Sequence, residues 1–307
     1  MKTVLVIGST GLVGSRVCRA ADEGGYEAHG THNARASPFP RSHKLDISDR
    51  EATLELVGQL KPVAIVNTAA LHNVDYCETH HEEAVRVNVE GTRNLALAAS
   101  KLNCRLVHIS TDYVFDGRRG HYSESDKPNP RNYYAWTKLE SEKAASSASS
   151  YAIARPSVVY GWNSLESQDI RSSSGKTVNF AMFVIDQLEK GHTVKAVTDQ
   201  YSSPTFADNL AEVLVRLIEH PERGVFHTAG RSCISRYKFA VKVAEVFGYP
   251  SDLVQPTQSS DFKQLAERPK NSCLKVDKAE RELGVRLLTV EEGIQSMKRQ
   301  AQSPVQM

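Results

Sequence analysis

Short apolar runs alternate along the first half of the chain with longer segments of helical periodicity. The runs are rich in β-branched residues and apolar nearly throughout, which is typical of strands buried on both faces of a sheet. The intervals between them are long enough for crossover helices, so the pattern predicts an α/β fold with a doubly wound parallel sheet. The expected strands are 3–7, 26–31, 63–67, 105–110 and 151–156, and the expected helices are 12–23, 49–60, 82–101 and the segment after Tyr134.

The regular alternation weakens after Gly161. Residues 162–177 are polar and serine-rich, which is typical of a flexible excursion, and helical and strand patterns resume at Asn179. The apolar spacing in 206–220 predicts an amphipathic helix. We therefore expect a Rossmann-like dinucleotide-binding domain over 1–156, with segments near 197–228 and 272–307 returning to it, and a smaller interleaved α/β substrate lobe within 157–271.

Composition narrows the functional classes. The 307 residues include 38 Lys and Arg against 36 Asp and Glu, spread along the chain, which argues against a nucleic-acid partner. No stretch approaches the roughly 20 apolar residues of a membrane helix, so we expect no membrane partner. The cysteines are odd in number and form no C-x-x-C pair, which predicts free thiols in a reducing, cytoplasmic setting. They are Cys18, Cys77, Cys104, Cys233 and Cys273.

Three glycines, Gly8, Gly11 and Gly14, span the junction between the first expected strand and the first expected helix. Glycines there let the backbone turn tightly and approach a pyrophosphate, while the helix N-terminus favours the anion through its free N–H groups and dipole. An ordinary turn at Gly11 is the alternative. We interpret the G-x-x-G-x-x-G spacing at this junction as a dinucleotide site.

The end of the second strand indicates which dinucleotide is bound. A carboxylate there would accept a hydrogen bond from the adenine ribose 2′-OH, but this stretch carries Thr31, His32 and Arg35 and no acid. Without the acid a 2′-phosphate is not repelled, and Arg35 could pair with it. We therefore expect NADPH, with NADH as the alternative. A solvated loop position for Arg35 is the competing interpretation.

Tyr134 and Lys138 stand four positions apart at the start of a polar helix and so share one face. A free tyrosine has a pKa of about 10, and an ammonium about 4 Å away could lower that pKa by a few units. We expect Lys138 to do this, making the phenol a usable proton donor. Ser110, Thr111 and Asp112 end an earlier strand, where the carboxyl edge of a parallel sheet faces the ligand crevice. Two ordinary surface residues are the alternative for the Tyr–Lys pair.

With these residues the chain resembles the extended short-chain dehydrogenase/reductase superfamily, and within it the dTDP-4-dehydrorhamnose reductases, over nearly its whole length. The glycine loop and the Y-x-x-x-K pair are common to the superfamily. More typical of the reductases are "NF" at 179–180, "DQYSSPT" at 199–205 and "RPKNSCL" at 268–274. The remaining matching segments are "LDISD" at 45–49, "NTAALHNVD" at 67–75, "VNVEGTRNLA" at 87–96, "STDYVFDG" at 110–117 and "YAWTK" at 134–138.

The resemblance implies a reaction and a set of site residues. Thr111 would hydrogen-bond the substrate carbonyl, Tyr134 would donate the proton, and Lys138 would hold the nicotinamide ribose while hydride passes to C4 of a nucleotide-linked 4-keto-6-deoxyhexose. Asn88 would be a helix asparagine near the lysine. The expected cofactor-binding residues are Gly8, Thr10, Gly11, Leu12, Val13, Gly14, Thr31, His32, Arg35, Asp46, Ile47, Ala69, Ala70, Leu71, Asn88, Tyr134 and Lys138. The expected substrate-binding residues are Asp112, Tyr113, Asn179, Gln200 and Arg268.

Other motifs have simpler interpretations. One short stretch holds several potential metal ligands but neither a C-x-x-C pair nor H-E-x-x-H, so we expect no metal site there. Ser235 and Lys238 match the S-x-x-K of β-lactamases, yet Ser235 is better interpreted as a helix N-cap. The potential ligands are His72, Asp75, Cys77, His80 and His81.

Two other functions share these motifs. The regulatory β subunit of methionine adenosyltransferase is similar to this family and works by partnering an enzyme. A sugar-nucleotide epimerase or dehydratase would also keep the glycine loop and the Tyr–Lys pair, with no net consumption of NADPH. The chain could form a homodimer in any of these functions.

Overall fold

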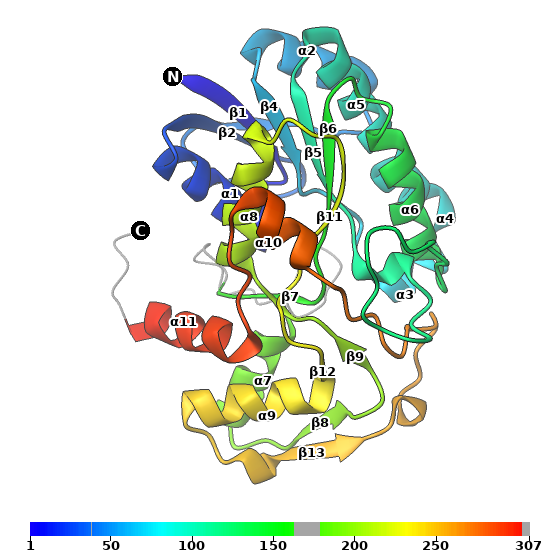
Figure 1. Cartoon of the computed structure of the whole chain (residues 1–307), viewed down its shortest axis with the longest axis vertical. Helices are drawn as coiled ribbons and strands as arrows, with labels where there is room; N and C mark the ends of the chain where they lie inside the picture. The colour runs from blue at the N-terminus through cyan, green and yellow to red at the C-terminus, as the bar shows by residue number, and fades with distance from the viewer. Residues whose placement is uncertain (38, 163–178, 303–307) are drawn as a thin grey trace.

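A seven-stranded parallel sheet forms the centre of the larger lobe, as predicted (Figure 1). The structure is a computed structural model, and it describes residues 1–37, 39–162 and 179–302. The strand order is β11-β6-β5-β4-β1-β2-β3, so the direction of winding changes between β1 and β4. The strands are β1 (Lys2–Ile7), β2 (Tyr26–His32), β3 (Ser42–Lys44), β4 (Ala64–Asn67), β5 (Arg105–Ile109), β6 (Tyr151–Arg155) and β11 (Gly224–His227).

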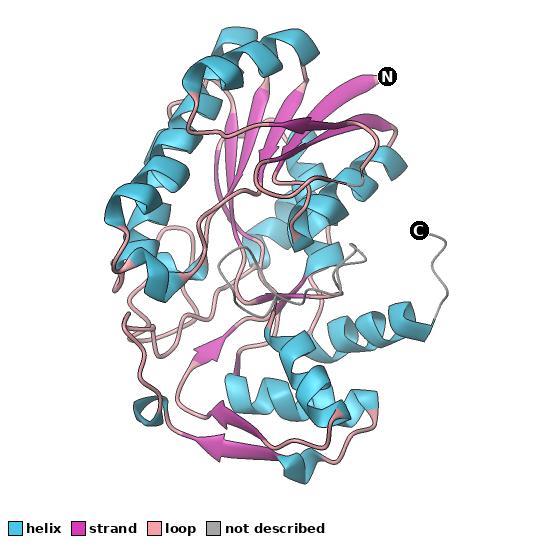
Figure 2. Ribbon diagram, turned by 180° about the vertical axis from the view of Figure 1, so that it is seen from behind, coloured by secondary structure: helices cyan, strands magenta, loops and turns pink. Residues whose placement is uncertain are grey.

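Helices cover both faces of this sheet (Figure 2). The strands are buried on both sides because alternate side chains enter different cores. In β1, Val4 and Val6 pack in one core cluster, whereas Leu5 and Ile7 pack in the other. The first core lies under α1 (Leu12–Glu23), α8 (Ala207–Glu219) and α10 (Asp277–Leu283), and the second under α2 (Arg50–Leu60), α5 (Gly91–Leu102) and α6 (Tyr133–Ala145).

A smaller lobe has its own hydrophobic core, which holds residues such as Val184, Phe239 and Ile294. Two of its helices begin at side-chain caps. Asn179 accepts a hydrogen bond from the Met182 N–H, and Ser235 accepts one from the Lys238 N–H, so the predicted N-cap role of Ser235 is confirmed. The elements are α7 (Phe180–Glu189), α9 (Arg236–Phe247), α11 (Val290–Gln302), and the parallel pair β8 (Val194–Val197) and β13 (Val254–Thr257).

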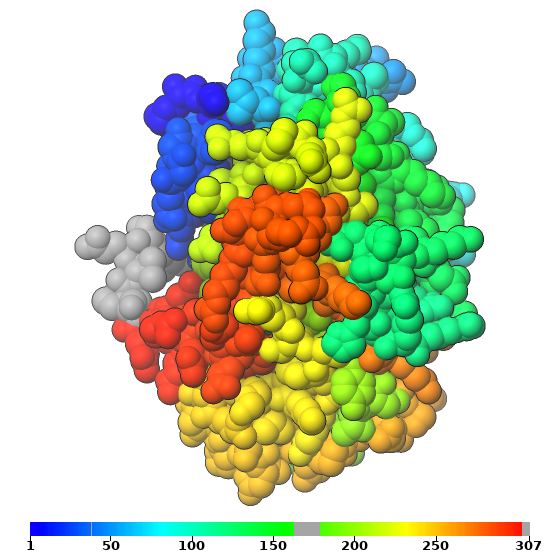
Figure 3. All heavy atoms as spheres, in the orientation of Figure 1, coloured from blue at the N-terminus to red at the C-terminus, as the bar shows by residue number. Residues whose placement is uncertain are grey.

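Two short strand pairs join the lobes. They are β7 (Val159–Tyr160) with β10 (Thr205–Phe206), and β9 (Tyr201–Ser202) with β12 (Ile234–Ser235). The last part of the chain, expected to return to the first domain, divides between the lobes. In the space-filling view α10 covers part of the larger lobe (Figure 3), whereas α11 packs its apolar face into the smaller core.

The predicted helix over 82–101 is interrupted. It consists of α4 (His81–Val85), a π-helical turn (Arg86–Glu90) and α5. A π turn shifts the helical register by one residue, and such turns are frequent at functional sites. Apolar periodicity does not reveal it, because the pattern on either side remains helical. Asn88 lies in this turn.

The expectation of five free thiols is wrong. Cys233 and Cys273 form a disulfide, while Cys18, Cys77 and Cys104 are free and buried. The two cysteines are 40 positions apart in the sequence, and their Cα atoms lie 5.5 Å apart. They meet because the strand β9 pairs with β12 on one side and bridges to Asn271 on the other. Sequence spacing does not indicate such a contact.

In the part of the chain that the structure describes, no helix combines the length and apolar character needed to cross a bilayer. The predicted excursion over 162–177 lies outside the described residues apart from Trp162. The other predicted helices and strands are confirmed, with differences of one or two residues at their ends.

Candidate functional site

The glycine loop forms a backbone cradle at the point where the winding of the sheet changes. Gly8 has φ +82°, a conformation that favours glycine, and its N–H donates to Thr31 Oγ1 at 3.1 Å. A Cβ atom on Gly14 would lie 2.2 Å from the Gly8 carbonyl oxygen, so the first turn of α1 packs directly on the loop. Gly11 is exposed at the N-cap of α1, where no side chain of the described residues caps the free N–H groups. This cradle fits a dinucleotide pyrophosphate.

The other predicted cofactor residues surround this cradle in different ways. Thr31 is fully buried and holds Gly8, so it supports the loop from within the fold. The His32 ring contacts Ser42 Oγ at 2.9 Å, and Arg35 lies exposed on the loop after β2. Ile47 packs in the core, while Asp46 accepts hydrogen bonds from Ser48. Thr10, Leu12 and Val13 lie in the glycine loop and the first turn of α1, and Ala69, Ala70 and Leu71 follow β4.

Asn88 fastens the loop after β4 to the helix that carries the Tyr–Lys pair. Its Oδ1 accepts from the Leu71 N–H at 2.8 Å, and its Nδ2 donates to the Leu71 carbonyl at 3.1 Å. The same Nδ2 donates to Thr137 Oγ1 at 3.0 Å. Asn88 thus bonds Thr137, the residue before Lys138. Its position in the π turn lets its side chain contact both Leu71 and Thr137.

The structure brings Thr111 and Tyr134 together. The Thr111 hydroxyl lies beside the Tyr134 phenol, and the Tyr113 ring stands edge-on to Tyr134 at a centroid distance of 6.4 Å. Burial raises the pKa of Tyr134, the Asp112 carboxylate raises it further, and the neighbouring Thr111 hydroxyl opposes the rise. The phenol is therefore protonated throughout the neutral range.

The expectation that Lys138 lowers the pKa of Tyr134 is not met. The Lys138 ammonium turns toward the end of β5, where Nζ donates to the Ile109 carbonyl at 2.6 Å and lies 3.4 Å from His108 Nε2. Burial lowers the pKa of Lys138 to about 8, with Glu142 opposing the shift. Spacing on a helix places two side chains on one face but does not fix where a flexible lysine ends.

His108 is a buried neighbour of Lys138 that the sequence argument missed. It is fully buried, with Nδ1 3.1 Å from Asn67 Nδ2 and Nε2 2.9 Å from Ser141 Oγ. Burial lowers its pKa well below the ordinary value, and the Lys138 charge lowers it further. The ring is therefore neutral and holds the base of α6 against β5.

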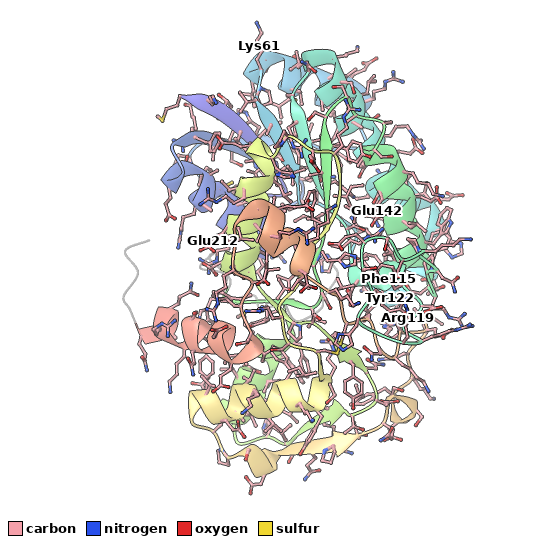
Figure 4. All side chains as sticks on the ribbon, in the orientation of Figure 1. Lys61, Phe115, Arg119, Tyr122, Glu142 and Glu212 are labelled. Atoms are coloured by element: carbon pink, nitrogen blue, oxygen red, sulfur yellow. A yellow bond between two sulfur atoms is a disulfide. The ribbon has the colours of Figure 1, made fainter. Side chains whose placement is uncertain are left out.

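A buried ion pair lies one helical turn beyond Lys138. Glu142 accepts from Arg155 Nε at 2.8 Å and from Nη2 at 2.6 Å, and Ser110 Oγ donates to it at 2.5 Å. Figure 4 shows Glu142 on α6, with Phe115 and Tyr122 side by side in the nearby loop. The Arg155 guanidinium lies 5.1 Å from the centre of the Phe115 ring. The pair joins α6 to the carboxyl ends of β5 and β6.

Asp112 connects three distant segments below Tyr134. Its Oδ2 accepts from Ser157 Oγ at 2.7 Å and from Ser272 Oγ at 2.5 Å, and Thr111 Oγ1 donates to Oδ1 at 3.2 Å. Burial raises the pKa of Asp112, while these hydrogen bonds act in the opposite direction. Asp112 is only 2 % exposed, so in this structure its carboxylate holds together the segments that form the site.

The remaining predicted substrate residues separate into two groups. Asn179 is buried at the start of α7, where Nδ2 donates to the Gly161 carbonyl at 2.9 Å. Arg268 forms a two-pronged ion pair with Asp75, with distances of 2.6 and 2.8 Å. Tyr113 and Gln200 are partly exposed. The stretch of potential metal ligands contributes Asp75 to this pair, and His81 stacks on Tyr133 at 3.7 Å.

Comparison with known proteins shows where this arrangement belongs. The family model described as "RmlD substrate binding domain" matches residues 1–303. The chain belongs to this family. Its predicted likeness to the extended short-chain dehydrogenase/reductases of the dTDP-4-dehydrorhamnose reductase type is thereby confirmed, together with the oxidoreductase class.

Three known proteins give the degree of similarity. The chain is 34% identical over 295 residues to the probable low-salt glycan biosynthesis reductase Agl14 of Haloferax volcanii, covering 95% of this chain and 96% of that protein. It is 32% identical over 286 residues to the methionine adenosyltransferase 2 subunit beta of Rattus norvegicus, covering 91% and 82%. The crystal structure of dTDP-4-dehydrorhamnose reductase from Bacillus anthracis in complex with NADP matches with a TM-score of 0.85 at 26% identity, covering 98% and 100%.

Several residues of this RmlD-family site escaped the sequence argument. Glu142 could have been found, because it lies four positions after Lys138 on the same helical face. His108 and Ser272 could not, since nothing in their local sequence indicates the partners that folding gives them. Arg236, discussed below, was likewise assigned no role.

Proposed function

We propose that this protein is an NADPH-dependent reductase of a nucleotide-linked 4-keto-6-deoxy sugar, such as a dTDP-linked one. The observation that carries the proposal is the contact between the Thr111 hydroxyl and the Tyr134 phenol at the carboxyl edge of the sheet. A glycine cradle that fits a pyrophosphate opens at the same edge. A hydroxyl and a phenol beside a dinucleotide cradle suit the reduction of a carbonyl.

In the proposed reaction the bound NADPH supplies a hydride to C4 of the sugar. The Thr111 hydroxyl orients the keto group, and Tyr134 donates its phenolic proton to the keto oxygen. The ketone thus gains one hydride and one proton and becomes an alcohol, and the phenolate takes a proton back from solvent. Thr111 and Tyr134 are the catalytic residues of this proposal, and Lys138 positions the cofactor ribose from the floor of the site.

The raised pKa of Tyr134 suits the direction of the reaction. Burial and the Asp112 carboxylate both disfavour the phenolate, so the side chain starts each cycle protonated. The Lys138 ammonium lies on the same helix but is directed to the Ile109 carbonyl, so its proposed role is the positioning of the cofactor ribose and not the stabilisation of the phenolate. Tyr134 is therefore ready to donate its proton to the keto oxygen without first having to take one up.

The proposal is tested by following the absorbance of NADPH against a panel of nucleotide-linked 4-keto-6-deoxy sugars. We expect stoichiometric consumption of NADPH with at least one substrate. Tyr134→Phe should lower kcat by roughly 10²-fold or more. Its affinity for NADPH should remain that of the wild type. Consumption without any dependence on Tyr134, or no consumption with any substrate, would contradict the proposal.

A second candidate function is that of a regulatory subunit. The sequence identity to the methionine adenosyltransferase 2 subunit beta favours it, because this identity, 32%, is close to the 34% identity to the probable reductase Agl14. Stable association with an enzyme of methionine adenosylation, together with retained effects on that enzyme in Tyr134→Phe, would support it. Dependence of NADPH oxidation on Tyr134 favours the reductase.

A further inference from the structure

Arg236 begins α9 at the junction of the two lobes, beside residues that the sequence already placed near the substrate. Its backbone N–H donates to the Gln200 carbonyl at 3.1 Å. The preceding residue, Ser235, pairs with Tyr201 across β12 and β9. The Tyr201 carbonyl in turn accepts from the Ser272 N–H at 3.0 Å. The Ser272 hydroxyl also donates to the Asp112 carboxylate near Tyr134. Strand β9, which holds Tyr201, therefore lies between the start of α9 and the segment that contacts Asp112.

The guanidinium of Arg236 is held on the face of an aromatic ring. Its central carbon lies 5.1 Å from the centre of the Phe180 ring, which directly follows the helix cap Asn179. A guanidinium stacked in this way keeps its edge N–H groups free to bind an anion. Both side chains are partly exposed, so the stacked pair borders solvent.

The charge of Arg236 is not neutralised within the described residues. No carboxylate among residues 1–37, 39–162 and 179–302 forms a salt bridge with it. Its charge nevertheless reaches the site, since burial raises the pKa of Asp112 and the Arg236 charge is among the groups that oppose this rise. Arg268, the cation that sequence motifs favoured for the substrate, is in contrast committed to Asp75 in a two-pronged pair.

We propose that Arg236, stacked on Phe180, binds the diphosphate of the nucleotide-linked sugar and thereby selects a charged substrate. The inference rests on the proposed function and adds a specificity-determining residue to it. An arginine offers a fork of N–H donors that matches phosphate oxygens, and a stacked ring pre-organises that fork. A neutral sugar would gain nothing from this contact.

The test compares the Arg236→Gln variant with wild type in two assays. Calorimetric titration of dTDP should give a Kd about 10-fold higher or more for the variant, the effect of losing a charged hydrogen-bond partner. Binding of thymidine, which lacks the phosphates, should be equal in both proteins. In turnover, KM for the nucleotide-linked sugar should rise while kcat and the KM for NADPH stay unchanged. Arg236→Lys should recover part of the loss.

Arg231→Gln is the matched control, because this exposed arginine lies in the same connection and faces Glu280. It should bind dTDP as wild type does. Phe180→Leu gives a second route, since losing the ring should weaken dTDP binding in the same direction without removing the charge. Wild-type affinity for dTDP in Arg236→Gln, or an equal loss in Arg231→Gln, would overturn the inference.

The outcomes separate this inference from the proposed function. If no sugar nucleotide is reduced but dTDP binding depends on Arg236, the inference stands and the reductase proposal fails. If sugar nucleotides are reduced with the same KM in Arg236→Gln as in wild type, the reductase proposal stands and the inference fails.

Discussion

The hydroxyl of Ser272 donates a 2.5 Å hydrogen bond to the carboxylate of Asp112, across 160 residues of chain. Asp112 lies just after the carboxyl end of β5, and Ser272 lies in the segment that returns from the smaller lobe. The disulfide at the adjacent Cys273 anchors that segment to the approach to β12. The contact fixes the smaller lobe against the floor of the candidate site.

Ser272→Ala should loosen this connection. The buried Asp112 carboxylate would lose one of its donors, and an unsatisfied buried group costs about 1–3 kcal/mol. We expect a fall of that size in the free energy of unfolding, measured by urea denaturation. Ser146→Ala, which removes an exposed hydroxyl just after the end of α6, should change it by less than about 0.5 kcal/mol. Equal effects in the two variants would mean that the contact does not hold the lobes.

Glu142→Gln should destabilise the fold far more than an exposed change on the same helix. Arg155 would remain buried with its charge unpaired, and breaking a buried pair costs about 3–5 kcal/mol. The comparison is Glu140→Gln, which breaks the exposed pair with Lys143 and should cost no more than about 1 kcal/mol. Denaturation midpoints of the two variants test this. Similar midpoints would show that the buried pair is not needed for stability.

The buried ammonium of Lys138 predicts that stability rises with pH in the alkaline range. Burial lowers its pKa to about 8 in the folded protein, from an ordinary value of 10.5. Between these two pH values the unfolded chain binds more protons, so the free energy of unfolding increases with pH. Lys138→Met should flatten that slope, whereas Lys143→Met, on the exposed face of α6, should preserve it. Urea denaturation at several pH values from 7.5 to 10.5 measures the slopes, and parallel curves for wild type and Lys138→Met would refute the assignment.

His227 predicts a loss of stability in acid. Burial lowers its pKa to about 3, and the neighbouring Arg155 charge lowers it further, while its hydrogen bond with the Lys275 carbonyl opposes the shift. The unfolded chain, with an ordinary pKa of 6.5, takes up a proton that the folded protein excludes. The free energy of unfolding should therefore fall as the pH drops from 6.5 toward 3.

The check is thermal or urea unfolding of His227→Gln between pH 7 and pH 4. The difference in the free energy of unfolding between this variant and wild type should shrink as the pH falls, because only the wild-type protein must release a proton from this histidine when it folds. His192→Gln, at an exposed ring near α7, should follow the wild-type curve. A constant difference across the range would exclude His227 as the titrating group.

The sheet and the Tyr–Lys helix were predictable from sequence because their signals are local. Continuous short apolar runs such as Val4 to Ile7 are typical of strands buried on two faces, and Gly8 and Gly14 mark the tight junction that follows. The direction of the Lys138 side chain was not predictable. Its partners, His108 and the Ile109 carbonyl, come from a strand 29 or 30 residues earlier and acquire their places only when α6 packs on β5.

By itself, the sequence determined the alternation of strands and helices, the glycine cradle and the residues able to handle a proton, since periodicity and residue type act over a few neighbouring positions. The tertiary structure decided which of those residues meet. It paired Arg268 with Asp75, stacked Arg236 on Phe180, and joined Cys233 to Cys273. The physical reason is that ion pairs, disulfides and buried hydrogen bonds depend on distances of a few ångströms between segments far apart in the chain, and only the packed fold sets those distances.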